Sequence, residues 1–160
     1  MLFRSSGGGI FNEDSAPTLT ACTIRSNHAD EYGGGMYNSV ATPILVDCIF
    51  EANVANRGGG MYIINSSPSL TGCVFESNIA AVSSSGDGAG MYNDESSPTL
   101  DDCTFTGNEA NNFYGGGMYN SSYTSPILDN CTFRENSALA GGGMYNFYNS
   151  PTLTNCTFTS

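Results

Sequence analysis

The chain repeats one sequence unit six times within its 160 residues. Each unit opens on a glycine-rich phrase whose clearest copy, Gly-Gly-Gly-Met-Tyr-Asn, occupies residues 115–120. Copies or near-copies of this phrase begin at Gly7, Gly33, Gly58, Gly88, Gly115 and Gly141. A fixed period of about 20 to 50 residues is typical of solenoids and other repeat architectures. The repeats therefore predict a single domain over residues 1–160.

A second repeated set of residues follows each glycine phrase within the unit. It consists of a proline, a leucine two residues later, a cysteine, an aromatic residue or isoleucine, and in most units an asparagine. In the fifth unit these residues are Pro126, Leu128, Cys131, Phe133 and Asn136. Extra residues collect at 80–87, 111–114 and 121–125. Because insertions in repeat proteins map to loops, we expect loops at these three places.

Short strands fit the unit better than helices do. Each unit is rich in Gly, Ser, Thr and Asn and has a proline near its middle, which disfavours a helix. Apolar and polar residues alternate in short pieces such as residues 103–105, as in a half-buried strand. Three such strands make one triangular coil, and stacked coils pair equivalent strands. The prediction is an all-β fold, a right-handed single-stranded parallel β-helix of about six coils with three parallel sheets.

Stacking turns every repeated position into a column, and four columns are expected to face inward. They are Leu19, Leu45, Leu70, Leu100, Leu128 and Leu153; Cys22, Cys48, Cys73, Cys103, Cys131 and Cys156; Ile24, Phe50, Phe75, Phe105, Phe133 and Phe158; and Ile10, Met36, Met61, Met91, Met118 and Met144. Stacked cysteines would have Cβ atoms about 4.8 Å apart, whereas a disulfide requires about 3.8 Å. We therefore expect six reduced thiols rather than disulfides, and we expect no metal at them.

One asparagine per coil is expected to form a corner ladder. Its members are Asn27, Asn53, Asn78, Asn108 and Asn136. Asparagine tolerates a left-handed backbone, and its amide can bond to the coils on either side. The expected role is structural.

The residue after each methionine should face outward and form an aromatic column. Its members are Tyr37, Tyr62, Tyr92, Tyr119 and Tyr145, with Phe11 in the first coil and further aromatic residues at Phe113, Tyr114, Tyr123, Phe147 and Tyr148 in nearby loops. Such a stripe can stack on sugar rings or pack against another subunit. The alternative is a self-stacking ladder that stabilises the sheet.

Two other outward features suggest ligands. Threonines flank the inward leucine at Thr18, Thr20, Thr99, Thr152 and Thr154, an arrangement that some ice-binding β-helices use, although Ile44, Val46, Asp101, Ile127 and Asp129 interrupt it. The carboxylates of Asp101, Asp102 and Asp129 either form a solvated acidic face or gather to hold a calcium ion.

Charge restricts the classes of function. The formal net charge is −11, and the sequence contains four arginines, no lysine and one histidine, His28. This balance disfavours nucleic acid and anionic lipid as partners. No run of about 18 apolar residues is present and residues 1–4 are too short for a signal peptide. Paired carboxylates would suit glycoside hydrolysis, but a lyase would need more basic residues, so we expect no catalytic residues and no cofactor.

The glycine phrase combined with Phe-x-x-Asn, as at residues 50–53, 75–78, 105–108 and 133–136, resembles the polymorphic outer membrane protein repeats of chlamydiae. More broadly, the chain is similar to right-handed β-helix repeats of large secreted bacterial surface proteins. The resemblance implies a non-catalytic, extracellular or cell-surface module used in adhesion or architecture. The chain has Gly-Met where Ala-Ile is more usual in the chlamydial pattern. The alternatives are a carbohydrate-binding or carbohydrate-active domain and an ice-binding protein.

The two ends of the repeat pattern are complementary. Placing residues 1–6 after Ser160 would put the next glycine phrase nine residues beyond Phe158, as Gly33 follows Ile24. We therefore expect either subunits that stack head to tail into a fibre or a segment of a longer β-helix.

Overall fold

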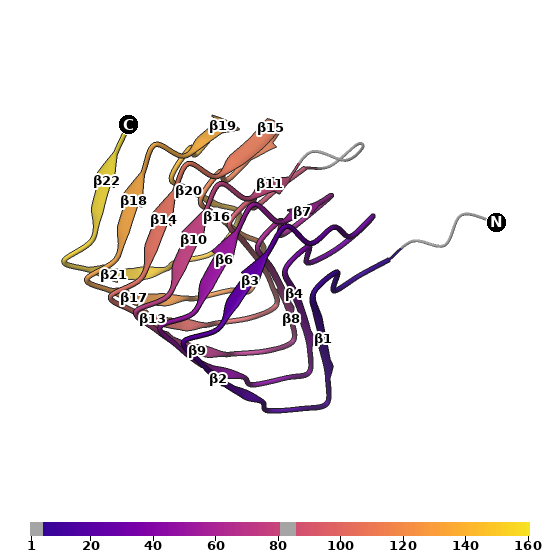
Figure 1. Cartoon of the computed structure of the whole chain (residues 1–160). Coiled ribbons are helices and arrows are strands. Elements are labelled where there is room, and N and C mark those ends of the chain that lie inside the picture. Colours follow the sequence, from indigo (N-terminus) through magenta and orange to yellow (C-terminus); the bar gives the residue numbers. More distant parts are fainter. Residues whose placement is uncertain (1–4, 81–85) are drawn as a thin grey trace.

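The described part of the chain winds through six stacked coils and contains 22 β-strands (Figure 1). The computed structural model describes residues 5–80 and 86–160. Across this described part of the chain, no helix is long and apolar enough to cross a membrane.

Three sheets contain six parallel strands each, one from every coil. The methionine sheet comprises β1 (Ile10–Glu13), β4 (Met36–Ser39), β8 (Met61–Ile64), β12 (Met91–Asp94), β16 (Met118–Asn120) and β20 (Met144–Asn146). The leucine sheet comprises β2 (Thr18–Thr20), β5 (Ile44–Val46), β9 (Ser69–Thr71), β13 (Thr99–Asp101), β17 (Ile127–Asp129) and β21 (Thr152–Thr154). The phenylalanine sheet comprises β3 (Thr23–Arg25), β6 (Ile49–Glu51), β10 (Val74–Glu76), β14 (Thr104–Thr106), β18 (Thr132–Arg134) and β22 (Thr157–Thr159).

A fourth, shorter sheet corrects the expectation of three. It comprises β7 (Val54–Ala55), β11 (Ile79–Ala80), β15 (Glu109–Tyr114) and β19 (Ser137–Ala140). Residues 111–114, which we expected to form a loop, belong to β15, whereas residues 121–125 do lie outside the strands. Of the expected loop at 80–87, residues 81–85 lie outside the described residues. The short sheet escapes prediction because two of its strands have only two residues and its inward residue is alanine, which is depleted in strands.

The strands pair in the register that the repeats predict. Leu100, for example, pairs with Leu70 on one side and with Leu128 on the other. Every strand pairing is parallel, and sequence equivalents therefore stack directly upon one another. Register is strongly specified because a slip of one residue would turn each inward side chain outward.

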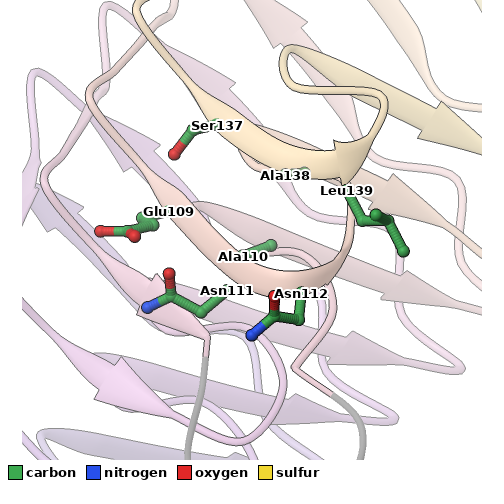
Figure 2. A pocket seen from close by; sticks show the side chains of 7 residues that line it. All are labelled: Glu109, Ala110, Asn111, Asn112, Ser137, Ala138 and Leu139. Carbon is green, nitrogen blue, oxygen red and sulfur yellow. The ribbon is translucent and has the colours of Figure 1, made fainter.

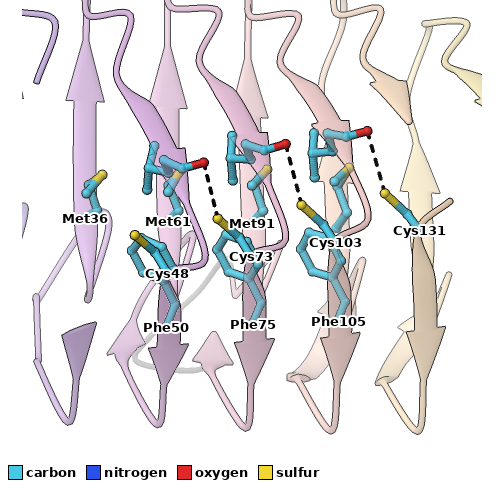
Figure 3. Packing of buried hydrophobic residues seen from close by; sticks show 14 of the residues in the cluster. Met36, Cys48, Phe50, Met61, Cys73, Phe75, Met91, Cys103, Phe105 and Cys131 are labelled. Carbon is cyan, nitrogen blue, oxygen red and sulfur yellow. Dashed lines mark hydrogen bonds between the residues drawn. The ribbon is translucent and has the colours of Figure 1, made fainter. Parts of the chain in front are cut away.

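The core consists of the four predicted columns. Phe50, Phe75, Phe105 and Phe133 are buried, and their stacked rings have centroids 4.6 to 4.8 Å apart. The cysteines of the middle coils point inward beside them (Figure 3). The end coils have a neighbouring coil on one side alone, and most of their column members are less buried. Ile10, Leu19, Cys22, Met144 and Cys156 are partly buried, Leu153 and Phe158 are exposed, and Ile24 is still buried.

All six cysteines are free, as predicted. Each thiol from Cys73 to Cys131 donates to the backbone oxygen of a leucine in the preceding coil, at 3.7 to 3.8 Å (Figure 3). Burial raises the pKa of the Cys48 thiol. These cysteines therefore act as small buried side chains with a weak donor.

The predicted asparagine ladder is confirmed, but its backbone conformation differs from the expectation. Asn53 accepts from the backbone nitrogen and side-chain nitrogen of Asn27 at 3.1 and 3.0 Å, and the pattern repeats up the column. The residue with positive φ is the one before each asparagine, for example Ala52 at 52° and Gly107 at 61°. The asparagines therefore satisfy corner backbone groups, while their predecessors make the turn.

A second asparagine ladder, which was not among the predicted columns although its asparagine ends the glycine phrase, runs inside the methionine sheet. Asn12 donates to Asn38 at 2.8 Å, and Asn93 donates to Asn120 at 2.7 Å. Between the two pairs, the register places Ile63 where an asparagine would stand. The ladder is therefore interrupted in the third coil.

Candidate functional site

The tyrosine column lies on the outer face of the methionine sheet, opposite the methionines. The rings from Tyr37 to Tyr145 stack with centroids 4.7 to 5.6 Å apart. Phe11 continues the stack at 4.9 Å from Tyr37. The alternation therefore placed these side chains on the correct face.

The middle of the column is nevertheless covered by other side chains rather than exposed to solvent. Tyr62, Tyr92 and Tyr119 are only 3, 6 and 9% exposed. Only Tyr37 and Tyr145, at the ends, are half-buried. Only the two ends of the column can still contact a ligand, and that role stays a prediction.

Side chains from the corner before each glycine phrase cover the column. The Tyr32 ring lies 4.7 Å from that of Tyr62, measured between centroids, and the Arg57 guanidinium carbon lies 5.5 Å from the centroid of Tyr92. Tyr114 stacks on Tyr145 at 4.7 Å in the same way. Sequence alternation could not reveal this cover because it comes from a neighbouring corner and has no repeated residue type.

Asp94 hydrogen-bonds to one of the covered tyrosines, Tyr62, and to Ser121. The Tyr62 hydroxyl donates to Oδ2 of Asp94 at 3.0 Å, and the Ser121 hydroxyl donates to Oδ1 at 2.7 Å. Burial, followed by the charge of Asp94, raises the pKa of Tyr62 far above its ordinary range. Burial also raises the pKa of Tyr92. Both phenols are therefore protonated at neutral pH and serve as hydrogen-bonding or packing groups rather than as bases.

Arg57 and Asp87 complete the cover. Burial acts to lower the pKa of Arg57, but the neighbouring Tyr92, Tyr32, Tyr62 and Asp87 outweigh it and raise that pKa. Burial raises the pKa of Asp87, although the backbone nitrogen of Tyr114 donates to its Oδ1 at 3.1 Å. These side chains thus form a packed layer over the tyrosine column, and their contacts stabilise the fold.

The aspartates considered for calcium do not assemble. Asp101 and Asp129 pair in register on the leucine sheet, but Asn130 and Asn155 each direct an amide nitrogen at one of them, both at 3.4 Å. Within residues 5–80 and 86–160, no group of three or more His, Cys, Asp or Glu side chains is arranged to hold a metal ion. The acidic residues therefore fit the alternative, a solvated face.

The threonine rows occupy the outer face of the leucine sheet. Its first outward column is exposed in every coil and contains Thr18, Ile44, Ser69, Thr99, Ile127 and Thr152. Threonine thus alternates with isoleucine and serine rather than forming an unbroken row. Ice binding remains a prediction.

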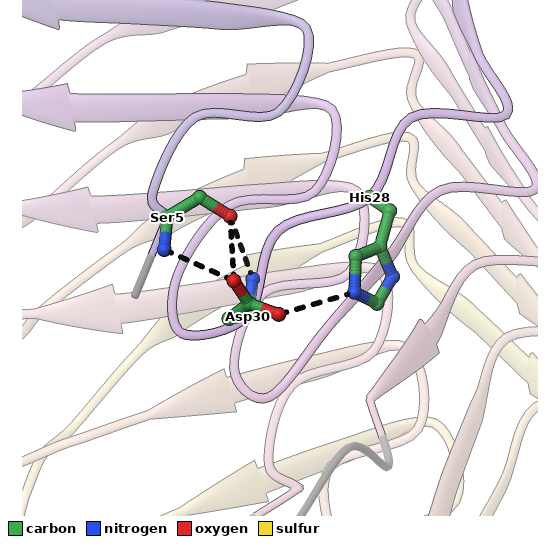
Figure 4. A network of polar contacts seen from close by, with 3 residues as sticks. All are labelled: Ser5, His28 and Asp30. Carbon is green, nitrogen blue, oxygen red and sulfur yellow. Dashed lines mark hydrogen bonds and ion pairs between the residues drawn. The ribbon is translucent and has the colours of Figure 1, made fainter. Parts of the chain in front are cut away.

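A serine, a histidine and an aspartate meet at an exposed corner, but their order differs from that of a hydrolytic triad (Figure 4). The hydroxyl of Ser5 donates to Asp30 Oδ2 at 3.2 Å, and His28 Nε2 lies 3.5 Å from Asp30 Oδ1. The aspartate stands between the other two, so the serine hydroxyl bonds to the carboxylate and not to the imidazole that would take its proton in a triad. Hydrogen bonds from the Ser5 backbone and hydroxyl lower the pKa of Asp30. The group fastens the first coil to the second.

A shallow groove of about 250 Å³ lies on the short sheet (Figure 2). It forms where the pairing of β15 with β19 shifts register between Ala110 and Tyr114. Glu109, Asn111, Asn112, Ser137 and Leu139 are among the residues lining it. Its polar groups lie along an open surface rather than converging on one point.

At each end of the solenoid, core side chains line a hollow that opens to solvent. A hollow of about 360 Å³ at the first coil is lined in part by Ile10, Leu19 and Cys22, and one of about 350 Å³ at the last coil is lined in part by Phe133 and Phe158. Strands of all three long sheets end there with an unpaired edge. Each face presents one member of every core column.

These features define a parallel β-helix whose repeated polar residues serve the fold. The model of the family described as "right handed beta helix region" matches residues 8–160, and the chain belongs to that family. A comparison with curated proteins gives no match.

Proposed function

We propose that the chain is a non-catalytic structural module of an extracellular or cell-surface assembly and that its coils stack end to end on those of a second copy. The observation that carries this proposal is the similarity of the two end faces. Both expose unpaired strand edges and the same columns of inward side chains. The resemblance to chlamydial surface repeats and the acidic, lysine-free composition support an extracellular setting.

The existing contacts between coils supply the pattern for such a junction. Between the fifth and sixth coils, Gly116, Gly117 and Met118 donate through their backbone nitrogens to the coil that follows. Gly142, Gly143 and Met144 are their equivalents in the last coil. They can donate in the same way to the first coil of a second copy.

The side chains also match across this junction. Ile10 would stack on Met144, Leu19 on Leu153, and Phe11 on Tyr145, which continues the columns already present. Asn146 accepts from Asn120 at 2.8 Å, and its own amide nitrogen would face the oxygen of Asn12. Each apolar contact removes surface that the single chain leaves exposed, such as the 40% exposed Leu153.

Charge does not oppose the contact. The overall formal charge is −11, yet residues 141–160 contain no Asp, Glu, Lys or Arg. The last coil therefore carries no charged side chain, and the acidic residues of a second copy would meet no like-charged side chain on it.

Sedimentation velocity over a range of protein concentrations tests the proposal. The average mass of the wild-type chain should rise with concentration, and Leu153→Asp should abolish the rise because it places a charge in the interface. The matched control is Thr152→Asp, an exposed outward position on the same strand β21, which should still associate. A wild-type chain that is monomeric at all concentrations, or equal association of both variants, would overturn end-to-end stacking.

A further inference from the structure

Two tyrosines protrude from the corner that connects the methionine sheet to the leucine sheet. Tyr123 and Tyr148 each stand three residues before the proline of their unit and are 86% and 83% exposed. Phe147 beside them is also exposed. We propose that this aromatic corner, defined as Tyr123, Phe147 and Tyr148, binds neutral glycans.

The fold does not account for tyrosine at this position. The equivalent residues in the first four coils are Asp14, Val40, Asn65 and Glu95. All six have positive φ, with 64° at Tyr123 and 49° at Tyr148. A left-handed backbone disfavours residues other than glycine, asparagine and aspartate. Tyrosine at this position has an unfavourable backbone conformation, yet its side chain stays largely exposed instead of being buried in the coil, which points to a role outside the fold.

Hydrogen bonds beneath the rings hold the two loops in place. The Thr124 hydroxyl donates to the backbone oxygen of Ser121 at 2.8 Å. The side-chain nitrogen of Asn149 lies within 2.8 to 3.2 Å of three backbone oxygens, including those of Asn120 and Ser121 in the neighbouring coil. The backbone under the rings is thus preorganised, which lowers the entropy cost of binding.

Two of the three rings contact each other. Phe147 packs edge-to-face on Tyr148, with centroids 4.5 Å apart and planes at 73°. Exposed aromatic faces of this kind stack on the C–H faces of sugar rings, and tyrosine hydroxyls add hydrogen bonds. The aromatic corner comprises three side chains, whereas a protein interface typically involves about 20 to 30 residues on each side, so the corner suits a sugar rather than a protein partner.

The surroundings select against charged ligands. Residues 115–128 and 141–155 contain no Asp, Glu, Lys or Arg but many Ser, Thr and Asn. No cation is present in these segments to pair with a uronate or sulfate group, and the net charge of −11 repels anions. Neutral hexose polymers present the matching combination of apolar C–H faces and uncharged hydroxyl groups.

Native electrophoresis in gels that contain a soluble neutral polysaccharide tests this proposal. The panel comprises a mixed-linkage β-glucan, a galactomannan and dextran, with polygalacturonate as the anionic comparison. At least one neutral polymer should retard the wild-type chain, and polygalacturonate should not. The double variant Tyr123→Asn and Tyr148→Asn should bind the retarding polymer at least about tenfold more weakly in titration calorimetry.

Val40→Asn provides a matched control. It places asparagine at the same left-handed corner position in the second coil, where no aromatic ring is lost. The melting temperature should rise for both the control and the double variant, whereas only the double variant should lose binding. A wild-type chain that no neutral polymer retards, or a double variant that binds as the wild type does, would overturn the proposal. The proposal would also fail if the polysaccharide gel retarded the double variant as strongly as the wild type while the double variant self-associated less in sedimentation velocity. That result would assign the rings to a protein contact. Leu153→Asp should leave binding unchanged, which separates this site from end-to-end stacking.

Discussion

A single residue, Ile63, interrupts the inner asparagine ladder. It is fully buried between Asn38 and Asn93, whose side chains are also fully buried. The amide nitrogen of Asn38 and the amide oxygen of Asn93 have no hydrogen-bond partner. The two unpaired groups face the gap from opposite sides, so the interruption itself explains both. Each buried unpaired group costs about 1 to 3 kcal/mol.

We predict that Ile63→Asn is tolerated, with a change in unfolding free energy within about 1 kcal/mol of zero. The substitution removes the stabilisation of about 1.5 to 3 kcal/mol that burial of the isoleucine side chain provides. Two restored hydrogen bonds offset this loss. Leu70→Asn is the control, since it buries an amide without a ladder and should cost at least about 3 kcal/mol. Urea denaturation measures both variants, and equal losses would contradict the ladder explanation.

Asp87 provides a pH-dependent prediction at the same scale. Because burial raises its pKa in the folded chain, the stability associated with its protonated form is present at low pH and is lost as pH rises through the folded value. Asp87→Asn keeps the acceptor for the Tyr114 backbone and should therefore stabilise the chain at pH 7. It should also flatten the fall in stability as the pH rises above about 4, the ordinary pKa of an aspartate.

Glu76→Gln is the control for Asp87→Asn because it removes one negative charge from an exposed position on β10. Thermal melts at several pH values compare the two variants. If Glu76→Gln reproduces the gain, the effect comes from net charge rather than from burial of Asp87.

At the scale of the element, the third glycine of each phrase sets how closely strands can pack at the corner. A Cβ atom at Gly117 would lie 2.4 Å from the Gly143 oxygen and 2.8 Å from the Phe133 ring. At Gly107, by contrast, the nearest atom would be the Ser77 hydroxyl oxygen at 3.7 Å. Backbone and core atoms therefore leave no room for a side chain at Gly117, whereas Gly107 has room for one.

We therefore predict that Gly117→Ala costs at least about 2 kcal/mol, because backbone and a core ring must both move. Gly107→Ala should cost less than about 1 kcal/mol despite its positive φ, since Ala52 holds the equivalent left-handed position in the second coil. Chemical denaturation of the two variants checks the ranking. A reversed order would mean that backbone conformation, rather than close approach, requires these glycines.

At the scale of the whole molecule, stability should decrease from the middle coils toward the ends. A coil in a solenoid contacts only its neighbours, so an end coil has half of the contacts of a middle coil. The cysteine column reports this gradient, because Cys48, Cys73, Cys103 and Cys131 are buried and Cys22 and Cys156 are partly exposed.

Thiol labelling of the native chain, followed by mass spectrometry, should modify Cys22 and Cys156 first. The four middle thiols should react only on unfolding. If copies stack end to end, raising the protein concentration should slow the labelling of both end thiols together. Uniform labelling of all six would contradict the stacked core.

Much of this fold follows from the sequence alone. A repeated unit places like residues upon one another, so the leucine, cysteine, phenylalanine and methionine columns and the corner asparagine ladder could be read directly. The short sheet could not, because strands as brief as Val54–Ala55 carry almost no periodic signal. The inner ladder was not predicted because an inward position is normally apolar, and Ile63 occupies it in the third coil.

For the candidate site, the sequence determined which face of the strand each tyrosine occupies, because side chains alternate along an extended backbone. Only the tertiary structure decided whether that face meets solvent. Tyr32 and Arg57 reach the column from corners that stack beside it, and they differ in residue type from coil to coil. Contacts made by non-repeated side chains across coils have no signature in the repeat, so the buried and the exposed aromatic residues could be separated only in three dimensions.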